Sequence, residues 1–205
     1  MPGRWIEAGR ASAKAGQRAM PVSAAKDDPE KARRFRDAAL PHLDDVYTLA
    51  RYLLRNPSDA EDAVQECYLR ALKHFDSYRG PAMKPWLFAI LRNVCHVEFA
   101  RRAHSPSEPA DQGSENAEQA PLWSEAQETP EAQIMRRAEA STIRRLVQAL
   151  AEPFRETFVL REVHDLSYRE IADIAAVPVG TVMSRLARAR TMLRSAWMAD
   201  QEQSK

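Results

Sequence analysis

The chain has little of what most enzymes and membrane proteins need. Among its 205 residues there are only two cysteines and six glycines, so we expect no disulfide framework and no glycine-rich phosphate loop. No apolar run approaches the roughly 20 residues that span a bilayer, and the amino-terminal residues lack the apolar block of a secretory signal. No nucleophile elbow and no metal-ligand spacing of cysteine or histidine occurs. We therefore expect a cytoplasmic protein that is not an enzyme and needs no metal or other cofactor.

Alternation of apolar and polar residues, the mark of β-strands, is also missing, whereas apolar residues recur at three- and four-residue spacing. Cys67 and Cys95 fall inside such helical patterns, where a small buried thiol is the natural interpretation. Hydrophobic residues make up 44% of the chain, enough to fill the cores of two small domains. The sequence thus predicts an all-α fold of two small helical domains joined by a flexible acidic linker.

The linker is identified by its charge. Between Ala103 and Met135 there are seven acidic residues and no Lys or Arg, although the whole chain has a net charge of +1. The same segment is rich in Ser, Pro and Gln and lacks helical periodicity, as flexible tethers do. The predicted organisation is a disordered leader (1–30, in which Met20 is an alternative start), a helical domain (31–102), the linker (103–131), a second helical domain (132–197) and a tail (198–205).

A helix-turn-helix pattern lies near the carboxyl terminus. Ser167 and Glu170 form an S-x-x-E capping box at the start of a short helix, and the segment 177–180, which contains a proline and a glycine, ends it. Thr181 is expected to cap a second helix whose apolar residues recur while its arginines project elsewhere. A basic helix of this kind fits the DNA major groove, where Arg pairs with guanine and with phosphates. The alternative is a solvated arginine face on a structural helical hairpin.

A second pattern, over Ser58 to Phe75, combines an apolar face with an acidic one. Ser58 and Glu61 predict another capping box. Asp59, Asp62 and Glu66 recur at three- and four-residue spacing opposite the apolar face, with Gln65 beside them. Such a stripe suits a basic protein partner, and the alternative is an ordinary solvated helix face with favourable charges near its amino terminus.

The segment from Phe75 to Leu87 brings aromatic residues and cations together ahead of a helix that contains Arg92 and Asn93. This mixture suits unpaired DNA, because extruded bases are held by stacking and by cationic side chains. Trp86 has an alternative role in the core, since it shares the stripe of Ile90 and Val94 on that helix.

Three motifs in this order carry a family resemblance: DAEDAVQECYLRAL (59–72), WLFAILRN (86–93) and LSYREIADIAAVPVGTVMSRLARAR (166–190). The chain resembles a group 4 extracytoplasmic-function sigma factor over roughly residues 35–102 and 135–196. The resemblance implies a sigma region-two domain that binds the clamp coiled coil of core RNA polymerase and a region-four domain that contacts its flap. It also implies binding to double- and single-stranded promoter DNA, control by an anti-sigma factor, and a stress or envelope response.

The resemblance assigns roles to individual residues. The core-binding motif corresponds to Asp59, Glu61, Asp62, Gln65 and Glu66. The part that opens the minus-ten element and captures a flipped base corresponds to Arg79, Lys84, Trp86, Arg92 and Asn93. The helix that recognises the minus-thirty-five element contributes Val179, Gly180, Thr181, Ser184, Arg185 and Arg188. The linker would cross a positively charged polymerase channel or serve as a plain solubilising tether.

Two departures from the family pattern concern the helix-turn-helix. Ala176 stands where the turn usually has Gly, so a left-handed backbone there would cost about 1 kcal/mol unless the turn differs. Met183 replaces a common lysine, which removes one expected phosphate contact. Two other functions are compatible with the residues: a stand-alone regulator that binds DNA through the helix-turn-helix, and a polymerase-binding or anti-factor-binding protein without promoter specificity.

Overall fold

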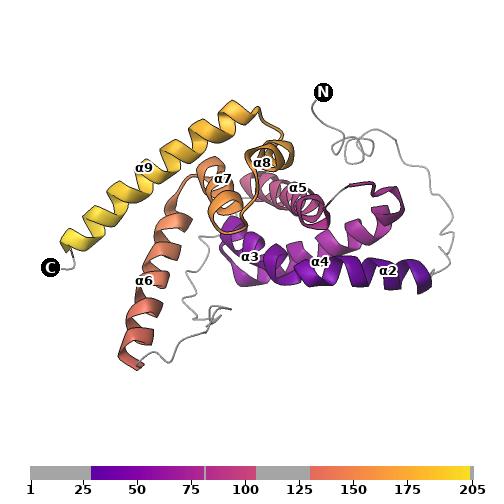
Figure 1. Cartoon of the computed structure of the whole chain (residues 1–205), viewed down its shortest axis with the longest axis horizontal. Helices are drawn as coiled ribbons and strands as arrows, with labels where there is room; N and C mark the ends of the chain where they lie inside the picture. Colours follow the sequence, from indigo (N-terminus) through magenta and orange to yellow (C-terminus); the bar gives the residue numbers. More distant parts are fainter. Residues whose placement is uncertain (1–28, 81, 105–129, 204–205) are drawn as a thin grey trace.

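The structure, a computed structural model, describes residues 29–80, 82–104 and 130–203, and these residues form helices connected by short turns. The first half contains α2 (Pro29–Ala39), the 3-10 turn η1 (Leu40–His42), α3 (Leu43–Leu54), α4 (Pro57–His74), η2 (Phe75–Ser77) and α5 (Met83–His104). The second half contains α6 (Pro130–Ala149), α7 (Glu152–Glu162), α8 (Tyr168–Ala175) and α9 (Val179–Gln203). The predicted all-α fold with two helical units is confirmed (Figure 1). Most of the predicted leader and linker lies outside the described residues.

In the first half, α3, α4 and α5 pack on one another. The turn between α3 and α4 depends on Arg55, whose φ of 65° reverses the chain, and on Asn56, whose side chain accepts hydrogen bonds from the amides of Ser58 and Asp59. Asn56 is therefore the N-cap of α4 and Pro57 its first residue. The predicted cap at Ser58 is wrong, because the asparagine two residues earlier already satisfies the free amides.

Cys67 of α4 and Cys95 of α5 are both buried, as the sequence predicted, and neither forms a disulfide. The Cys67 thiol donates a hydrogen bond of 3.5 Å to the carbonyl oxygen of Leu87. Burial raises the pKa of this thiol to about 12. A thiol with so high a pKa is inert, so Cys67 has a packing role.

In the second half, α9 packs along α7, α8 and α6. Val182, Leu186 and Ala189 of α9 are buried against this group, as their spacing predicted. The apolar residues of α6 are unequally buried: Leu146 and Val147 enter the core, whereas Ile143 is 49% exposed. The helices also continue past the predicted domain ends at residues 102 and 197, to His104 in α5 and to Gln203 in α9.

The two halves are in contact, with α7 against α3 and α8 against α5 (Figure 1). Buried residues of both halves form one continuous hydrophobic core. Arginines cross the interface in both directions: Arg55 donates to the carbonyl of Gln148 at 2.7 Å, and Arg155 donates to the carbonyl of Leu53 at 3.3 Å. Both carbonyls lie in the last turn of their helices, where a cation meets the negative end of the helix dipole.

None of the helices in the described part of the chain is long and apolar enough to cross a membrane.

Candidate functional site

The helix-turn-helix has the predicted start. Ser167 Oγ accepts a hydrogen bond from the amide of Glu170 at 3.3 Å, and Glu170 Oε2 accepts one from the amide of Ser167 at 2.8 Å. This reciprocal pair is the capping box of α8, and its prediction is confirmed. The helix ends at Ala176, whose φ of 53° and ψ of 44° are left-handed. The turn therefore has the left-handed backbone geometry that Gly would favour, and Ala176 adopts it at a cost in conformational free energy.

The second helix of the motif, α9, begins two residues before the predicted cap. Proline at 178 precedes the first helical residue, and its carbonyl accepts a hydrogen bond from the amide of Thr181 at 2.9 Å. Thr181 therefore lies inside the first turn, and its prediction as N-cap is wrong. Of the predicted DNA contacts on α9, Val179, Gly180, Ser184 and Arg188 are exposed, and Thr181 and Arg185 are half-buried. The start of α9 thus presents most of these side chains to solvent.

The acidic face of α4 is directed outward. Glu61, Asp62 and Gln65 are exposed, and Asp59 and Glu66 are half-buried. Glu66 Oε1 accepts a hydrogen bond from Arg70 Nε at 2.5 Å, which leaves its other oxygen for a partner. The structure adds a residue that the sequence analysis missed: Leu69, 57% exposed, lies three and four residues after Glu66 and Gln65. Leu69 does not share the spacing of the apolar face of α4, and this could have predicted its exposure from the sequence.

The loop before α5 holds aromatic side chains against one another. The ring centroids of Tyr78 and Trp86 are 4.8 Å apart, and Trp86 is half-buried against the core, as its alternative role required. Burial raises the pKa of the Tyr78 hydroxyl. Arg79 is exposed, and its Nη1 donates to the carbonyl oxygens of Asp76 and Tyr78 at 2.6 and 2.8 Å. The Arg79 guanidinium therefore binds the backbone of its own loop while its side chain remains exposed.

Two predicted DNA contacts on α5 are occupied by carboxylates. Lys84 Nζ lies 2.9 Å from Asp45 Oδ2 on α3. Arg92 Nε donates to Glu156 Oε1 on α7 at 2.5 Å, and the side chains of this pair are only 16% and 2% exposed. Burial raises the pKa of Glu156, although Arg92 acts in the opposite direction. Asn93, the remaining predicted contact on α5, is exposed.

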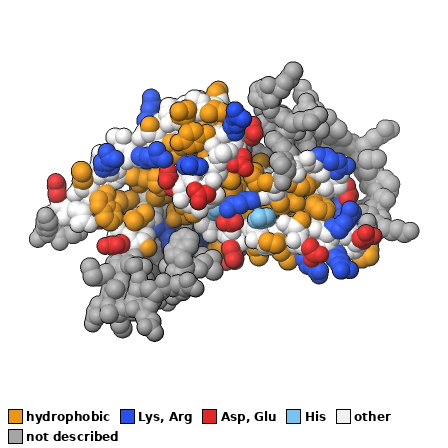
Figure 2. All heavy atoms as spheres, viewed as in Figure 1, with side chains coloured by type: hydrophobic (Ala, Val, Ile, Leu, Met, Phe, Trp, Pro, Cys, Tyr) orange, Lys and Arg blue, Asp and Glu red, His pale blue; other side chains and the backbone are white. Residues whose placement is uncertain are grey.

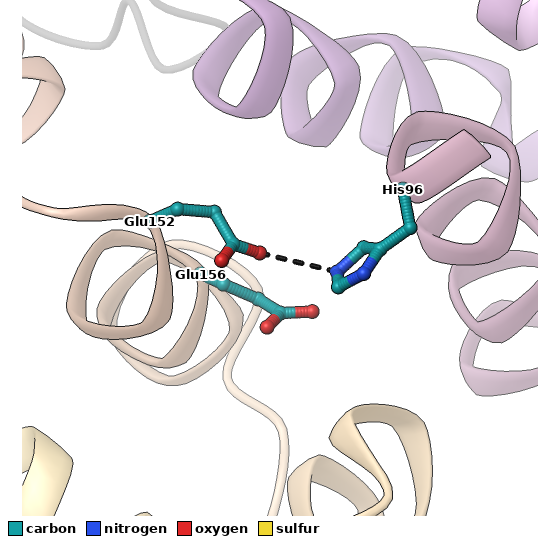
Figure 3. Close-up of side chains that lie close together, drawn as sticks. All are labelled: His96, Glu152 and Glu156. Atoms are coloured by element: carbon teal, nitrogen blue, oxygen red, sulfur yellow. Dashed lines mark ion pairs between the residues drawn. The ribbon is translucent and has the colours of Figure 1, made fainter. Parts of the chain in front are cut away.

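A second interdomain pair lies one turn along α5. His96 Nε2 is 3.1 Å from Glu152 Oε1, and this hydrogen bond is the main reason that the pKa of Glu152 is lowered (Figure 3). Ligand atoms of His96, Glu152 and Glu156 lie within 4.8 Å of one another, a spacing that could in principle hold a metal ion. Glu156 is already paired with Arg92, however, and Glu152 with His96, so these carboxylates have partners within the chain.

Asp45 links the halves at another point. Its Oδ1 lies 3.3 Å from His164 Nδ1, while its Oδ2 holds Lys84. His164 follows α7, and its side chain is 1% exposed. Its ring packs edge-on against the Phe88 ring, with the two ring centroids 4.7 Å apart. The Nε2 atom of His164 has no hydrogen-bond partner in the structure. Burial and the charge of Lys84 lower the pKa of His164 to about 4, so the ring is neutral and donates from Nδ1 to Asp45.

An apolar groove lies where α6, α7 and α9 meet, and orange side chains gather between α6 and α9 in Figure 2. It is lined by Ile143, Leu146, Val147, Phe158, Leu193, Arg194 and Trp197. Ile143, which is 49% exposed, lines this groove and does not enter the core.

Two protein-family models match the chain in sequence. Residues 39–105 match Sigma-70 region 2, and residues 141–193 match Sigma-70, region 4. The chain is 30% identical to the RNA polymerase sigma-H factor of Pseudomonas aeruginosa, over 80% of this chain and 86% of that protein. It is 33% identical to the ECF RNA polymerase sigma-E factor of Haemophilus influenzae, over 72% of this chain and 78% of that protein.

Solved structures share the fold. The sigma factor RpoE from Bartonella quintana, solved with the anti-sigma factor NepR, superposes with a TM-score of 0.61 at 24% identity, over 82% of this chain and 99% of that one. CnrH, solved with the cytosolic domain of CnrY, gives a TM-score of 0.58 at 22% identity, over 82% of this chain and 90% of that one.

Proposed function

Because this chain belongs to the extracytoplasmic-function (ECF) family of RNA polymerase sigma factors, we propose that it binds core RNA polymerase and directs it to promoters with two recognised elements. The observation that carries the proposal is the pairing of an outward acidic helix, α4, with an exposed helix-turn-helix, α8 and α9, in one chain. We place the protein in group 4, in the cytoplasm, and assign it no covalent chemistry.

For core polymerase we propose two contacts. The acidic face of α4, with the exposed Leu69 beside it, combines carboxylates with an apolar side chain, which suits a specific interface with a basic protein partner. The groove between α6, α7 and α9 suits an apolar segment such as the polymerase flap, because its lining is aromatic and aliphatic with one arginine at the edge.

For DNA we propose that α9 recognises the upstream element, with Arg185 and Ser184 the best placed to reach bases from the first turns of the helix. The loop with Arg79 and the start of α5 would hold the melted downstream element. Arg92 is half-buried and paired with Glu156 in this structure, so its contact with DNA requires this pair to break.

We further propose that an anti-sigma factor restrains the protein until a stress or envelope signal releases it. RpoE, which shares this fold, was solved in complex with such a factor. If the free protein drives full transcription in cells without any inducing stress, this part of the proposal is wrong.

The decisive experiment is run-off transcription with purified core RNA polymerase on the promoter of the protein's own gene. We expect a specific transcript that core polymerase alone does not produce. Binding to a palindromic operator without any transcript would instead support a stand-alone regulator. Binding to polymerase without promoter selection would support an interaction protein.

A further inference from the structure

The apolar groove formed by α6, α7 and α9 leaves large side chains open to water. Ile143 is 49% exposed on its α6 side, and Trp197 is half-buried on its α9 side. Apolar surface gathered in one exposed place is typical of a binding site. The groove also has positive charge at its edge, because Arg194 is among its lining residues and Arg144 is exposed beside Ile143. An occupant with apolar side chains and flanking acids would match both properties.

One segment of the chain has this composition. The residues between α5 and α6, 105–129, contain only two large apolar side chains, Leu122 and Trp123, and these are adjacent. Glu118 and Glu125 flank the pair, and no Lys or Arg occurs in this range. Tryptophan is a common anchor of binding interfaces, since it brings a large apolar area with few rotatable bonds. This pair therefore suits the groove in both shape and charge.

The connection to α6 is long enough for the pair to reach the groove. Ile143 lies about 20 Å along the helix axis from Pro130, where α6 begins. Leu122 precedes Pro130 by eight residues, so an extended chain can carry it up to about 26 Å from that point. A segment tethered so closely has an effective concentration in the millimolar range at the groove.

The amino-terminal residues also contain an apolar pair, Trp5 and Ile6, but they suit the groove less well. Basic residues outnumber acidic ones over 1–28, and they would meet the arginines at the groove edge. These residues join the described chain at α2, which lies at the opposite end of the molecule from α6 (Figure 1). Charge and distance thus both favour the segment that precedes α6.

We propose that Leu122 and Trp123 dock into the groove of their own chain, with the flanking acids facing Arg194 and Arg144. The docking is a property of the free chain and goes beyond the proposed function. One consequence does rest on that function: the polymerase flap, proposed above for the same groove, would have to displace this segment before it binds.

Fluorine NMR of the full chain labelled with fluorotryptophan tests the docking. Trp197 lines the groove, whereas Trp86 packs on the core in the first half and serves as an internal reference. The variant Leu122→Ser/Trp123→Ser removes the apolar pair and leaves every described helix intact. We expect the Trp197 resonance to shift in this variant and the Trp86 resonance to stay unchanged. An unshifted Trp197 resonance would overturn the proposal.

The matched control is Ala110→Ser/Gln112→Ser, which introduces two serines elsewhere in the same segment. It should change neither resonance, and a shift of Trp197 here would contradict a specific role for the apolar pair. Sedimentation of the wild-type chain tests another occupant. A Trp197 resonance that changes with protein concentration, together with a dimer, would mean that a second copy fills the groove, and the proposal would then be wrong.

A synthetic peptide of residues 118–129 measures the affinity. It should bind the Leu122→Ser/Trp123→Ser chain about tenfold more tightly than the wild-type chain if its Kd is about 0.1 mM, because the native segment competes at a millimolar effective concentration. Adding Ile143→Glu, at an exposed position of the groove, should abolish this binding. Equal affinities for the two chains, or tighter binding of a peptide of residues 1–12, would overturn the proposal.

Run-off transcription on the same proteins keeps the two proposals apart. If no protein yields a transcript, the proposed function is contradicted, while the docking is still decided by the resonance and the peptide affinity of the free chain. If transcripts appear but Trp197 and the peptide do not respond, the docking alone is wrong.

Discussion

The two helices expected to contact DNA differ in one respect. Of the six predicted contacts on α9, four are exposed and two are half-buried, whereas on α5 Lys84 is paired with Asp45 and Arg92 with Glu156. Both helices carry arginines at helical spacing, so their sequences look equivalent. The difference arises from tertiary packing. Of the two surfaces expected to bind DNA, the one on α9 is mostly exposed in this structure, whereas the cations of the one on α5 are paired with carboxylates.

The buried arginine pair should matter far more to stability than an exposed one. Arg92→Ala leaves the Glu156 carboxylate, 2% exposed, without its cation, and we expect a loss of about 3 kcal/mol in the free energy of unfolding. Arg190→Ala breaks the half-exposed pair with Glu162 and should cost about 0 to 1 kcal/mol. Urea denaturation of both variants measures the contrast. Equal losses would mean that the interdomain pair is not formed in solution.

Mutations on the two surfaces should also separate two activities. Arg185→Ala should weaken binding to the upstream element by about 1 to 3 kcal/mol if it pairs with a base, and leave polymerase binding intact. Asp62→Arg, on the acidic face of α4, should do the reverse. Filter binding to promoter DNA and co-elution with core polymerase test the pair. Loss of both activities in either variant would contradict the assignment.

Acid should open the closed chain through His164. Its pKa is about 4 when it is buried near Asp45, Lys84 and Phe88, and it should return toward 6.5 when the halves separate. The closed state is therefore favoured above pH 6.5, and the ratio of open to closed chains should rise by up to about tenfold for each pH unit between 6.5 and 4.

The raised pKa of Glu156 acts in the opposite direction, since a proton on that group is bound more tightly in the closed chain. The effect of His164 is therefore isolated by comparing the wild-type chain with His164→Asn across this pH range. The readout is the distance between spin labels placed on α2 and on α9. An identical pH profile in the two proteins would exclude the histidine as its source.

The smallest effect concerns the turn of the helix-turn-helix. Ala176→Gly should stabilise the protein by about 0.5 to 1 kcal/mol, because glycine adopts a φ of 53° without strain. Ala187→Gly, at an exposed position inside α9, should destabilise it by a similar amount. Thermal unfolding of the two variants gives the sign directly, and a loss of stability in both would show that the turn relaxes in solution.

Local features of this fold could be predicted from the sequence because neighbouring residues determine them. The Ser167 and Glu170 capping box depends on a four-residue pattern, and the burial of Val182 and Leu186 follows from helical spacing. The predictions at Ser58 and Thr181 were wrong because nearby residues compete: Asn56 caps α4 first, and the proline at 178 starts α9 early.

The pairing of α5 side chains with acids of α7 could not be predicted in this way. Arg92 and Glu156 are separated by 64 residues, and the acidic segment between the two domains says nothing about how they pack. The same applies to Leu69, whose role depends on which side of α4 remains uncovered, and to Ile143 at the apolar groove. The assigned roles of the candidate residues in DNA and polymerase binding stay predictions until the variants above are measured.

The continuous core that joins the two halves has a thermodynamic consequence. Separation of the halves exposes apolar surface around Phe88 and its neighbours to water, and hydration of such surface raises the heat capacity. The free energy of opening must then curve with temperature and pass through a maximum. The fraction of open chains would be smallest at that temperature and would grow on both heating and cooling. The fraction of open chains would therefore depend on temperature even in the isolated protein, without any partner bound.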